Sequence, residues 1–158
     1  MLAQNTGKDR TVRFSKLRQC VFALALLAAA GFARATPDLA APEAAAAVAA
    51  GKLTLIDIRT PGEWRETGLA KGAKQVDMMH PQGAQGFVGQ LLGTVKGDRN
   101  APIALICRTG NRSTQVQRYL QSVGFTQVYN VPEGMAGSSA GPGWLKRGLP
   151  VQACTQQC

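Results

Sequence analysis

One cysteine in this chain stands where thiol chemistry is expected. Cys107 follows the apolar run 101–106, which predicts a buried strand. It comes shortly before residues 113–120, whose pattern predicts a helix that ends near Gly124. The cysteine therefore falls in a tight turn between strand and helix. Backbone N–H groups of such a turn point at one spot, and the helix dipole adds positive potential there.

The turn around Cys107 predicts a nucleophile with its own binding groups. A thiol among such dipoles is expected to ionise, and the thiolate is the reactive form. We expect Arg108 to contact an anionic substrate, because it follows the nucleophile directly. For Arg112 substrate contact and bracing of the loop stay equally open, and for Ser113 helix capping is favoured over a hydrogen bond to sulfur. The candidate binding and loop residues are Arg108, Thr109, Gly110, Asn111, Arg112 and Ser113.

The elements that must position this turn alternate between strand and helix. β-Branched and apolar runs predict strands over residues 53–58, 73–76, 103–106 and 127–131, and helical spacing is found over 85–92. Alternation of this kind predicts an α/β fold of three layers, with a central, mostly parallel sheet of about five strands and helices on both faces. Ligands of such sheets bind outside the carboxyl ends of the strands, which is where Cys107 is placed.

Three further segments have recognisable local signals. Thr60 can cap a helical turn, with Pro61 at its first position and Glu63 three residues after the cap. The Ala-rich segment 36–50 predicts either a helix that Gly51 ends or a partly ordered linker. The Gly-, Ser- and Pro-rich segment 134–143 predicts a surface loop.

The first 35 residues have the layout of a secretory signal peptide. A basic leader precedes the apolar stretch Cys20–Ala33, and Ala33-Arg34-Ala35 is a cleavage sequence. Fourteen apolar residues are too few to cross a bilayer comfortably, although an uncleaved anchor is the alternative. We therefore expect a periplasmic or secreted protein of one domain, residues 36–158, without stable membrane association after cleavage.

Charge and cysteine content limit the classes of partner that we expect for that domain. The leader holds six basic residues and one acidic residue, so +4 of the formal charge of +9 stays with residues 36–158. This modest excess favours small anionic substrates and gives no reason to expect nucleic-acid binding. Three cysteines remain after cleavage, and the simplest division pairs Cys154 with Cys158 and leaves Cys107 free.

Three stretches, in this order, resemble the single-domain rhodanese family of sulfurtransferases. They are the residues from Asp57 to Trp64, the loop from Cys107 to Ser113, and the closing segment Gly134–Trp144 with Gly148-Leu149-Pro150-Val151. The resemblance implies the rhodanese-like fold and a Cys107 persulfide. That persulfide would take its sulfur from a donor such as thiosulfate and lose it to cyanide or a thiol. It implies no cofactor and no metal.

The loop spacing separates this chemistry from phosphate-ester hydrolysis. A phosphatase loop has five residues between cysteine and arginine, whereas four separate Cys107 from Arg112. The shorter loop makes a smaller amide cup, which suits one sulfur atom better than a phosphoryl group. Two other functions stay open: a non-catalytic persulfide carrier for a protein partner, and a thiol-disulfide redox protein.

For the other candidate residues, structural roles are favoured over chemical ones. We expect Asp57 and Arg59 to form an ion pair that scaffolds the loops rather than to take part in the chemistry. The family's Gly-His-Ile-Pro-Gly-Ala stretch is replaced by residues 68–73, which lack its histidine and proline. Met78-Met79-His80 could bind a soft metal, but loop packing is favoured.

The tail Cys154-Thr155-Gln156-Gln157-Cys158 is the last motif. Cysteines four residues apart can pair on one helical face, and a disulfide that closes so short a loop stabilises little. A stabilising disulfide is favoured here, and a relay pair that accepts sulfur from Cys107 is the alternative.

Overall fold

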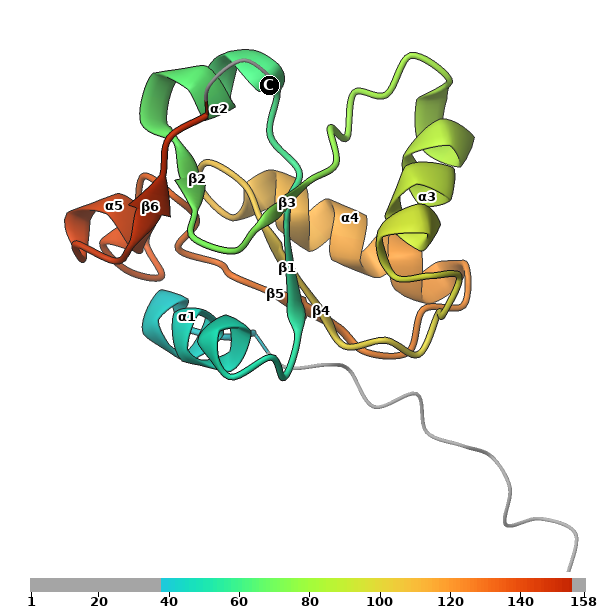
Figure 1. The fold of residues 1–158 in the computed structure, drawn as a ribbon, viewed down its shortest axis with the longest axis horizontal. Coiled ribbons are helices and arrows are strands. Elements are labelled where there is room, and N and C mark those ends of the chain that lie inside the picture. The colour runs from blue at the N-terminus through green and yellow to red at the C-terminus, as the bar shows by residue number, and fades with distance from the viewer. Residues whose placement is uncertain (1–37, 155–158) are drawn as a thin grey trace, which may run out of the picture. The chain divides into compact units, whose positions relative to one another are not determined.

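In the computed structural model, which describes residues 38–154, four parallel strands form the central sheet (Figure 1). Along the sheet their order is β3-β1-β4-β5. The strands are β3 (Lys74–Gln75), β1 (Thr54–Asp57), β4 (Ile103–Ile106) and β5 (Val128–Asn130). Their carboxyl ends lie at one edge, so the segments that follow them meet there.

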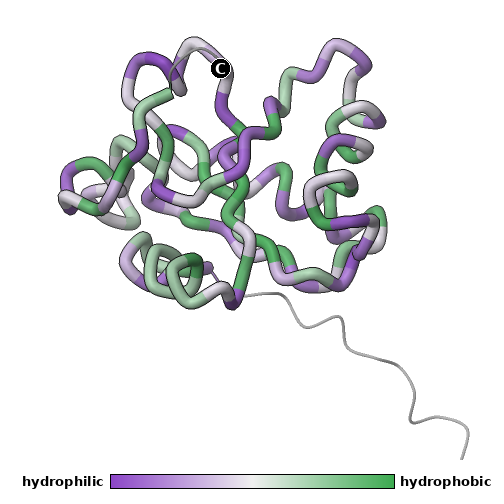
Figure 2. Tube along the Cα trace, in the orientation of Figure 1, coloured by the Kyte–Doolittle hydropathy of each residue, from purple (hydrophilic) through white to green (hydrophobic). Residues whose placement is uncertain are grey.

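Helices cover both faces of the sheet. Helices α1 (Ala41–Ala49) and α5 (Gly143–Lys146) pack on one face, and α3 (Gly83–Thr94) and α4 (Asn111–Ser122) pack on the other (Figure 1). Strand β4 serves both layers, because successive residues of a strand point to opposite faces. Ile103 and Leu105 join the α3–α4 side, whereas Ala104 and Ile106 join the α1–α5 side. Figure 2 shows apolar residues concentrated along these inner strands.

The predicted α/β architecture of three layers is confirmed, with one difference in the sheet. Four strands make the central sheet, where about five were expected. The remaining strands, β2 (Leu69–Ala70) and β6 (Val151–Gln152), form a separate antiparallel pair. Each is two residues long, which is too short to produce a hydrophobic period in the sequence.

Two of the helices have local signals in the sequence. The Ala-rich segment forms α1, with Ala41 and Ala44 fully buried against the sheet, so the linker alternative is wrong for these residues. Helix α2 (Pro61–Thr67) begins after Thr60, whose hydroxyl accepts from the Glu63 amide while the Glu63 carboxylate accepts from the Thr60 amide. This reciprocal capping satisfies two N–H groups that the helix itself cannot pair.

The prediction of a surface loop over residues 134–143 is wrong for its first half. Gly134 and Met135 are buried, and the Met135 amide donates to the Cys107 carbonyl at 2.9 Å. Glycine and serine content indicated a loop correctly but could not show that the turn Cys107–Gly110 covers it. Residues 138–140 at the tip are exposed.

No helix within residues 38–154 combines the length and the apolar character needed to cross a membrane. The predicted signal peptide lies outside the described residues.

Candidate active site

The turn after β4 places the Cys107 sulfur in a closed, polar setting. Cys107 is 1% exposed and is the free cysteine among the residues that the structure describes. Gly110 has a left-handed backbone, with φ +86°, and this conformation turns its N–H toward the cysteine. The Gly110 amide donates to Sγ at 3.1 Å. A hydrogen bond of this kind stabilises negative charge on the sulfur.

Ser113 contacts the same sulfur from the first turn of α4. Its Oγ lies 3.4 Å from Sγ and 2.9 Å from the Gly110 carbonyl oxygen, and its single proton can serve either acceptor. The expectation that Ser113 caps the helix is wrong. Helix α4 begins at Asn111, with Gly110 as its N-cap, so Ser113 stands inside the first turn.

The segment after β5 supports the turn Cys107–Gly110 through backbone hydrogen bonds. The amides of Met135 and Ala136 donate to the carbonyls of Cys107 and Arg108, at 2.9 and 2.8 Å. A Cβ added at Gly110 would lie 1.9 Å from the Pro132 carbonyl oxygen. The turn and its backing are therefore packed backbone against backbone, and only glycine fits at position 110.

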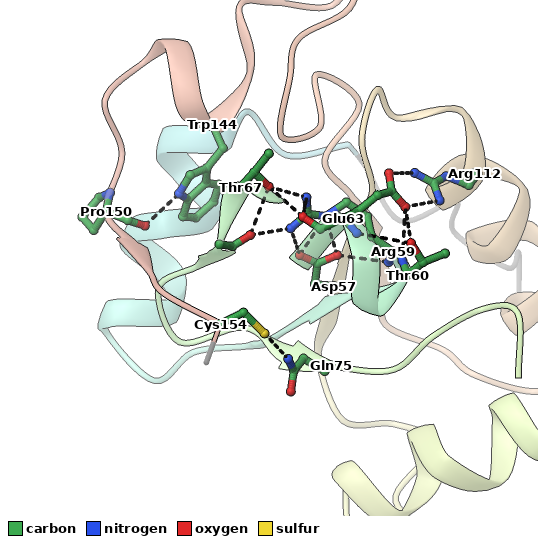
Figure 3. A network of polar contacts seen from close by, with 11 residues as sticks. Asp57, Arg59, Thr60, Glu63, Thr67, Gln75, Arg112, Trp144, Pro150 and Cys154 are labelled. Carbon is green, nitrogen blue, oxygen red and sulfur yellow. Dashed lines mark hydrogen bonds and ion pairs between the residues drawn. The ribbon is translucent and has the colours of Figure 1, made fainter. Parts of the chain in front are cut away.

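Arg112 is paired with a carboxylate from another element. Its guanidinium donates two hydrogen bonds to Glu63 of α2, at 2.5 and 2.8 Å (Figure 3). The bond from Arg112 lowers the pKa of Glu63 to about 2. In return Glu63 raises the pKa of Arg112, and a smaller contribution in the same direction comes from Cys107. The sequence left two roles open for Arg112, substrate contact and bracing of the loop. The pairing with Glu63 gives the bracing role a defined partner.

Arg108 differs from Arg112 in its surroundings. It is exposed, and within residues 38–154 no carboxylate forms an ion pair with it. Asn111 is also exposed and Thr109 is half-buried, whereas Gly110 is buried. The turn thus presents one uncompensated guanidinium to solvent beside a buried sulfur.

Asp57 and Arg59 form a fully buried ion pair at the end of β1, with 2.7 Å between Arg59 Nη2 and Asp57 Oδ2. The same guanidinium donates to the Gly68 carbonyl, the Thr67 hydroxyl and the Glu63 carbonyl, so it fixes the end of α2 (Figure 3). The Nε, Nη1 and Nη2 atoms of Arg59 therefore all donate hydrogen bonds within this network. The ion pair thus fixes helix α2, which carries Glu63, and Glu63 is the residue that binds Arg112.

Glu133 is a second buried carboxylate that sequence reasoning missed. It accepts from the amides of Ala41 and Gly143 and from the Arg147 guanidinium, at 2.8, 2.9 and 2.7 Å. Desolvation alone would raise the pKa of Glu133, but the hydrogen bonds from Arg147 and the two amides outweigh it and lower the pKa. Glu133 therefore ties α1 and α5 to the segment behind Cys107. No local pattern signals such long-range pairs.

Met78, Met79 and His80 lie on a different part of the same edge. Met79 is 70% exposed, Met78 packs against the core, and His80 accepts a hydrogen bond from the Gln82 amide. With Phe87 of α3 and with Val116 and Tyr119 of α4 they line an open apolar groove of about 530 Å³. Within residues 38–154 no three His, Cys, Asp or Glu side chains are grouped as metal ligands are.

Cys154, of the predicted tail pair, is disulfide-bonded. Its predicted partner Cys158 lies outside the described residues, so that pairing stays a prediction.

Comparisons with known proteins agree with this geometry. A sulfurtransferase from Allochromatium vinosum is 30% identical over 99 residues, which cover 63% of this chain and 78% of that protein. The polysulfide-sulfur transferase homodimer from Wolinella succinogenes has a similar structure, with a TM-score of 0.57, 25% identity, and coverage of 77% of this chain and 82% of that one. A crystal structure from M. tuberculosis gives a TM-score of 0.59 at 25% identity, over 75% of this chain and 98% of that one.

One assignment accounts for the buried cysteine in its glycine turn, the parallel sheet behind it and the sequence similarity. Residues 40–140, well over half of the chain, match the rhodanese-like domain family. The chain therefore belongs to that family.

Proposed function

We propose that this protein is an exported sulfurtransferase that carries sulfane sulfur on Cys107. Family membership and the sulfurtransferase relatives support sulfur transfer in general. The observation that supports the covalent role most directly is the hydrogen bond from the Gly110 amide to Sγ, in a turn that leaves the cysteine free and buried.

The reaction has two displacements. The Cys107 thiolate attacks the outer sulfur of a donor such as thiosulfate, the sulfur–sulfur bond of the donor breaks, and sulfite leaves with the electron pair. An acceptor, cyanide or a thiol, then attacks the outer sulfur of the Cys107 persulfide and restores the thiolate. Neither step requires a side chain that acts as acid or base.

Main-chain dipoles supply the stabilisation of the outer sulfur in this proposal. The first N–H groups of a helix have no partner within it, and those of α4 begin at Asn111. They carry partial positive charge and are fixed before the reaction starts, so they stabilise an anionic sulfur without reorganisation. The tight approach of Gly110 to Pro132 keeps this cup small, which favours a single sulfur atom over a phosphoryl group.

The anionic donor is recruited by Arg108. Its exposed guanidinium lacks an ion-pair partner among residues 38–154, whereas the charge of Arg112 is compensated by Glu63. A planar guanidinium suits the oxygens of thiosulfate. A small anion is therefore expected to bind with its sulfonate oxygens at Arg108 and its outer sulfur toward Cys107.

The decisive experiment compares Cys107→Ser with His80→Ala in a thiosulfate–cyanide assay. We expect Cys107→Ser to lower thiocyanate formation by more than about 1,000-fold, because the covalent carrier is lost. His80→Ala alters a residue of the same sheet edge that has no role in the proposal, and its rate is expected to stay within about twofold. Equal activity of Cys107→Ser and the unmodified protein would refute the assignment.

Mass spectrometry separates the enzyme from a persulfide carrier. After exposure to thiosulfate, Cys107 is expected to gain one sulfur atom, about 32 Da. Loss of this adduct on addition of cyanide, at the rate of turnover, supports the enzyme. An adduct that cyanide does not remove would favour the carrier.

A further inference from the structure

The carbonyl oxygen of Gly110, at the start of α4, is surrounded by more donors than it can accept. Three donor groups lie within hydrogen-bond distance: the Thr114 amide at 3.0 Å, the Thr114 hydroxyl at 2.9 Å and the Ser113 hydroxyl at 2.9 Å. A carbonyl oxygen has two lone pairs, so one of the three donors is in excess. The Ser113 hydroxyl also lies 3.4 Å from the Cys107 sulfur, and it is therefore the donor that can leave the carbonyl.

Asn130, at the end of β5, determines where the Thr114 hydroxyl proton points. The Asn130 side chain is buried, and its Nδ2 donates to Thr114 Oγ1 at 3.1 Å and to Asp38 Oδ1 at 3.2 Å. A hydroxyl that accepts from one side keeps its single proton for another acceptor. The proton of Thr114 is thus directed away from Asn130 and donated to the Gly110 carbonyl.

The charge of Asp38 fixes the Asn130 amide in this orientation. Asn130 Oδ1 is buried and has no hydrogen-bond partner within residues 38–154. A half-turn of the amide would let Oδ1 accept from the Thr114 hydroxyl, but it would also place Oδ1 against the Asp38 carboxylate, and both of these oxygens are acceptors. The structure therefore keeps Nδ2 toward Thr114, although the buried oxygen lacks a hydrogen bond.

We propose that Thr114 is a positioning residue that releases the Ser113 hydroxyl to the Cys107 sulfur. The inference rests on the proposed function for its use in sulfur transfer, because the released hydroxyl acts on the anionic sulfur. While Thr114 supplies both donors of the Gly110 carbonyl, Ser113 turns to Sγ without leaving a buried acceptor unpaired. Ser113 then adds a second hydrogen bond to the one from the Gly110 amide, and both stabilise negative charge on the sulfur.

The same donors predict the effect of removing the Thr114 hydroxyl. The Gly110 carbonyl keeps the Thr114 amide and takes the Ser113 hydroxyl as its second donor. The Cys107 sulfur then loses its bond from Ser113, although Ser113 itself is unchanged. Such a loss at the sulfur depends on the presence of Ser113, whereas a contribution of Thr114 to the stability of α4 does not.

The test follows ionisation of Cys107 through the ultraviolet absorbance of its thiolate as a function of pH. The whole protein is used, and subtraction of the Cys107→Ser spectrum removes the absorbance of other residues. In Thr114→Val the pH at which half of the thiol is ionised is expected to rise by about one unit, because a hydrogen bond to a charged acceptor is lost. Arg112, whose pKa is raised in part by Cys107, is unchanged in these variants, so its charge contributes equally to each of them.

A double-mutant cycle separates positioning from helix stability. Ser113→Ala is expected to raise the midpoint as much as Thr114→Val, and the combined variant is expected to raise it no further, because both changes remove the same bond. Thr114→Ser keeps the hydroxyl and is expected to keep the midpoint of the unmodified protein. Urea unfolding of each variant ensures that the midpoint belongs to folded protein. An unchanged midpoint in Thr114→Val would overturn the proposal, as would shifts that add in the combined variant.

A second measurement keeps this proposal distinct from the proposed function. The unmodified protein and Thr114→Val are mixed with thiosulfate, and the mass of the peptide that contains Cys107 is followed. Coupled midpoints together with a gain of one sulfur atom support both proposals. Coupled midpoints without any gain of sulfur in the unmodified protein would refute sulfur transfer, while the positioning of Ser113 by Thr114 would stand.

Discussion

A single methyl group at Gly110 tests whether the geometry of the turn supports the proposed reactivity of Cys107. Alanine there would place its Cβ 1.9 Å from the Pro132 carbonyl oxygen and 2.6 Å from the Pro132 carbonyl carbon. Both are backbone atoms, so no side-chain rotation can relieve the overlap. The turn has to move by more than about 1 Å, since non-bonded carbon and oxygen atoms approach to only about 3.3 Å.

That movement has two separate costs. A left-handed backbone costs an L residue about 1–2 kcal/mol, and Gly110 has φ +86°. In addition the hydrogen bond from the Gly110 amide to Sγ is lost, and a bond to a charged acceptor contributes about 1.5–3 kcal/mol. We expect Gly110→Ala to lower kcat/KM for thiosulfate by about 100-fold, because a misplacement of about 1 Å at a reacting group has an effect of this size.

Gly97→Ala is the matched control for backbone strain. Gly97 has φ +81°, and an added Cβ would meet nothing within 4 Å. It should therefore lower the free energy of unfolding by about 1 kcal/mol and leave turnover within about twofold. Thiocyanate kinetics and urea unfolding measure both quantities. If Gly110→Ala retains activity like Gly97→Ala, the argument that a fixed amide stabilises the sulfur is refuted.

Three further predictions concern the charged residues around the turn. Glu63→Gln should lower the free energy of unfolding by about 2 kcal/mol near pH 7, because the Arg112 ion pair holds the pKa of Glu63 near 2. This contribution is present above pH 4.5 and is lost as the pH falls toward 2, so urea unfolding of the two proteins should converge there; a constant difference would contradict it. Arg59→Met leaves the Asp57 carboxylate buried without its partner, and we expect a loss of about 3–5 kcal/mol by thermal unfolding. Arg108→Gln should raise KM for thiosulfate about tenfold and reduce its salt dependence, with kcat nearly unchanged; an unchanged KM would exclude Arg108 from donor binding.

Much of the site was predictable because its parts are close in the sequence. Strand β4, the turn Cys107–Gly110 and helix α4 form one continuous segment, and local patterns describe such a segment well. The Thr60–Glu63 capping box was also predicted from adjacent residues. Ser113 was misassigned as a cap, since a left-handed Gly110 begins the helix earlier than side-chain preferences suggest.

The partners of the charged groups were not predictable in this way. Glu63 was assigned to capping alone, although its carboxylate also binds Arg112, 49 residues further along the chain. Glu133 joins Ala41 and Arg147 across the molecule, and no spacing rule connects them. The two-residue strands β2 and β6 were missed for the same reason, because only their pairing with each other makes them strands.

The sequence by itself determined that a lone cysteine would stand in a tight, glycine-containing turn between a strand and a helix, because an apolar run ends directly before Cys107 and a helical pattern follows it. Tertiary structure decided which of the two arginines pairs with a carboxylate, and how tightly the turn is held. It did so because Glu63 reaches the turn from α2, whereas Pro132 and Met135 reach it from the segment that follows β5, and the parallel sheet brings them to one edge. Contacts between distant segments depend on the folded arrangement, and local patterns carry no record of them.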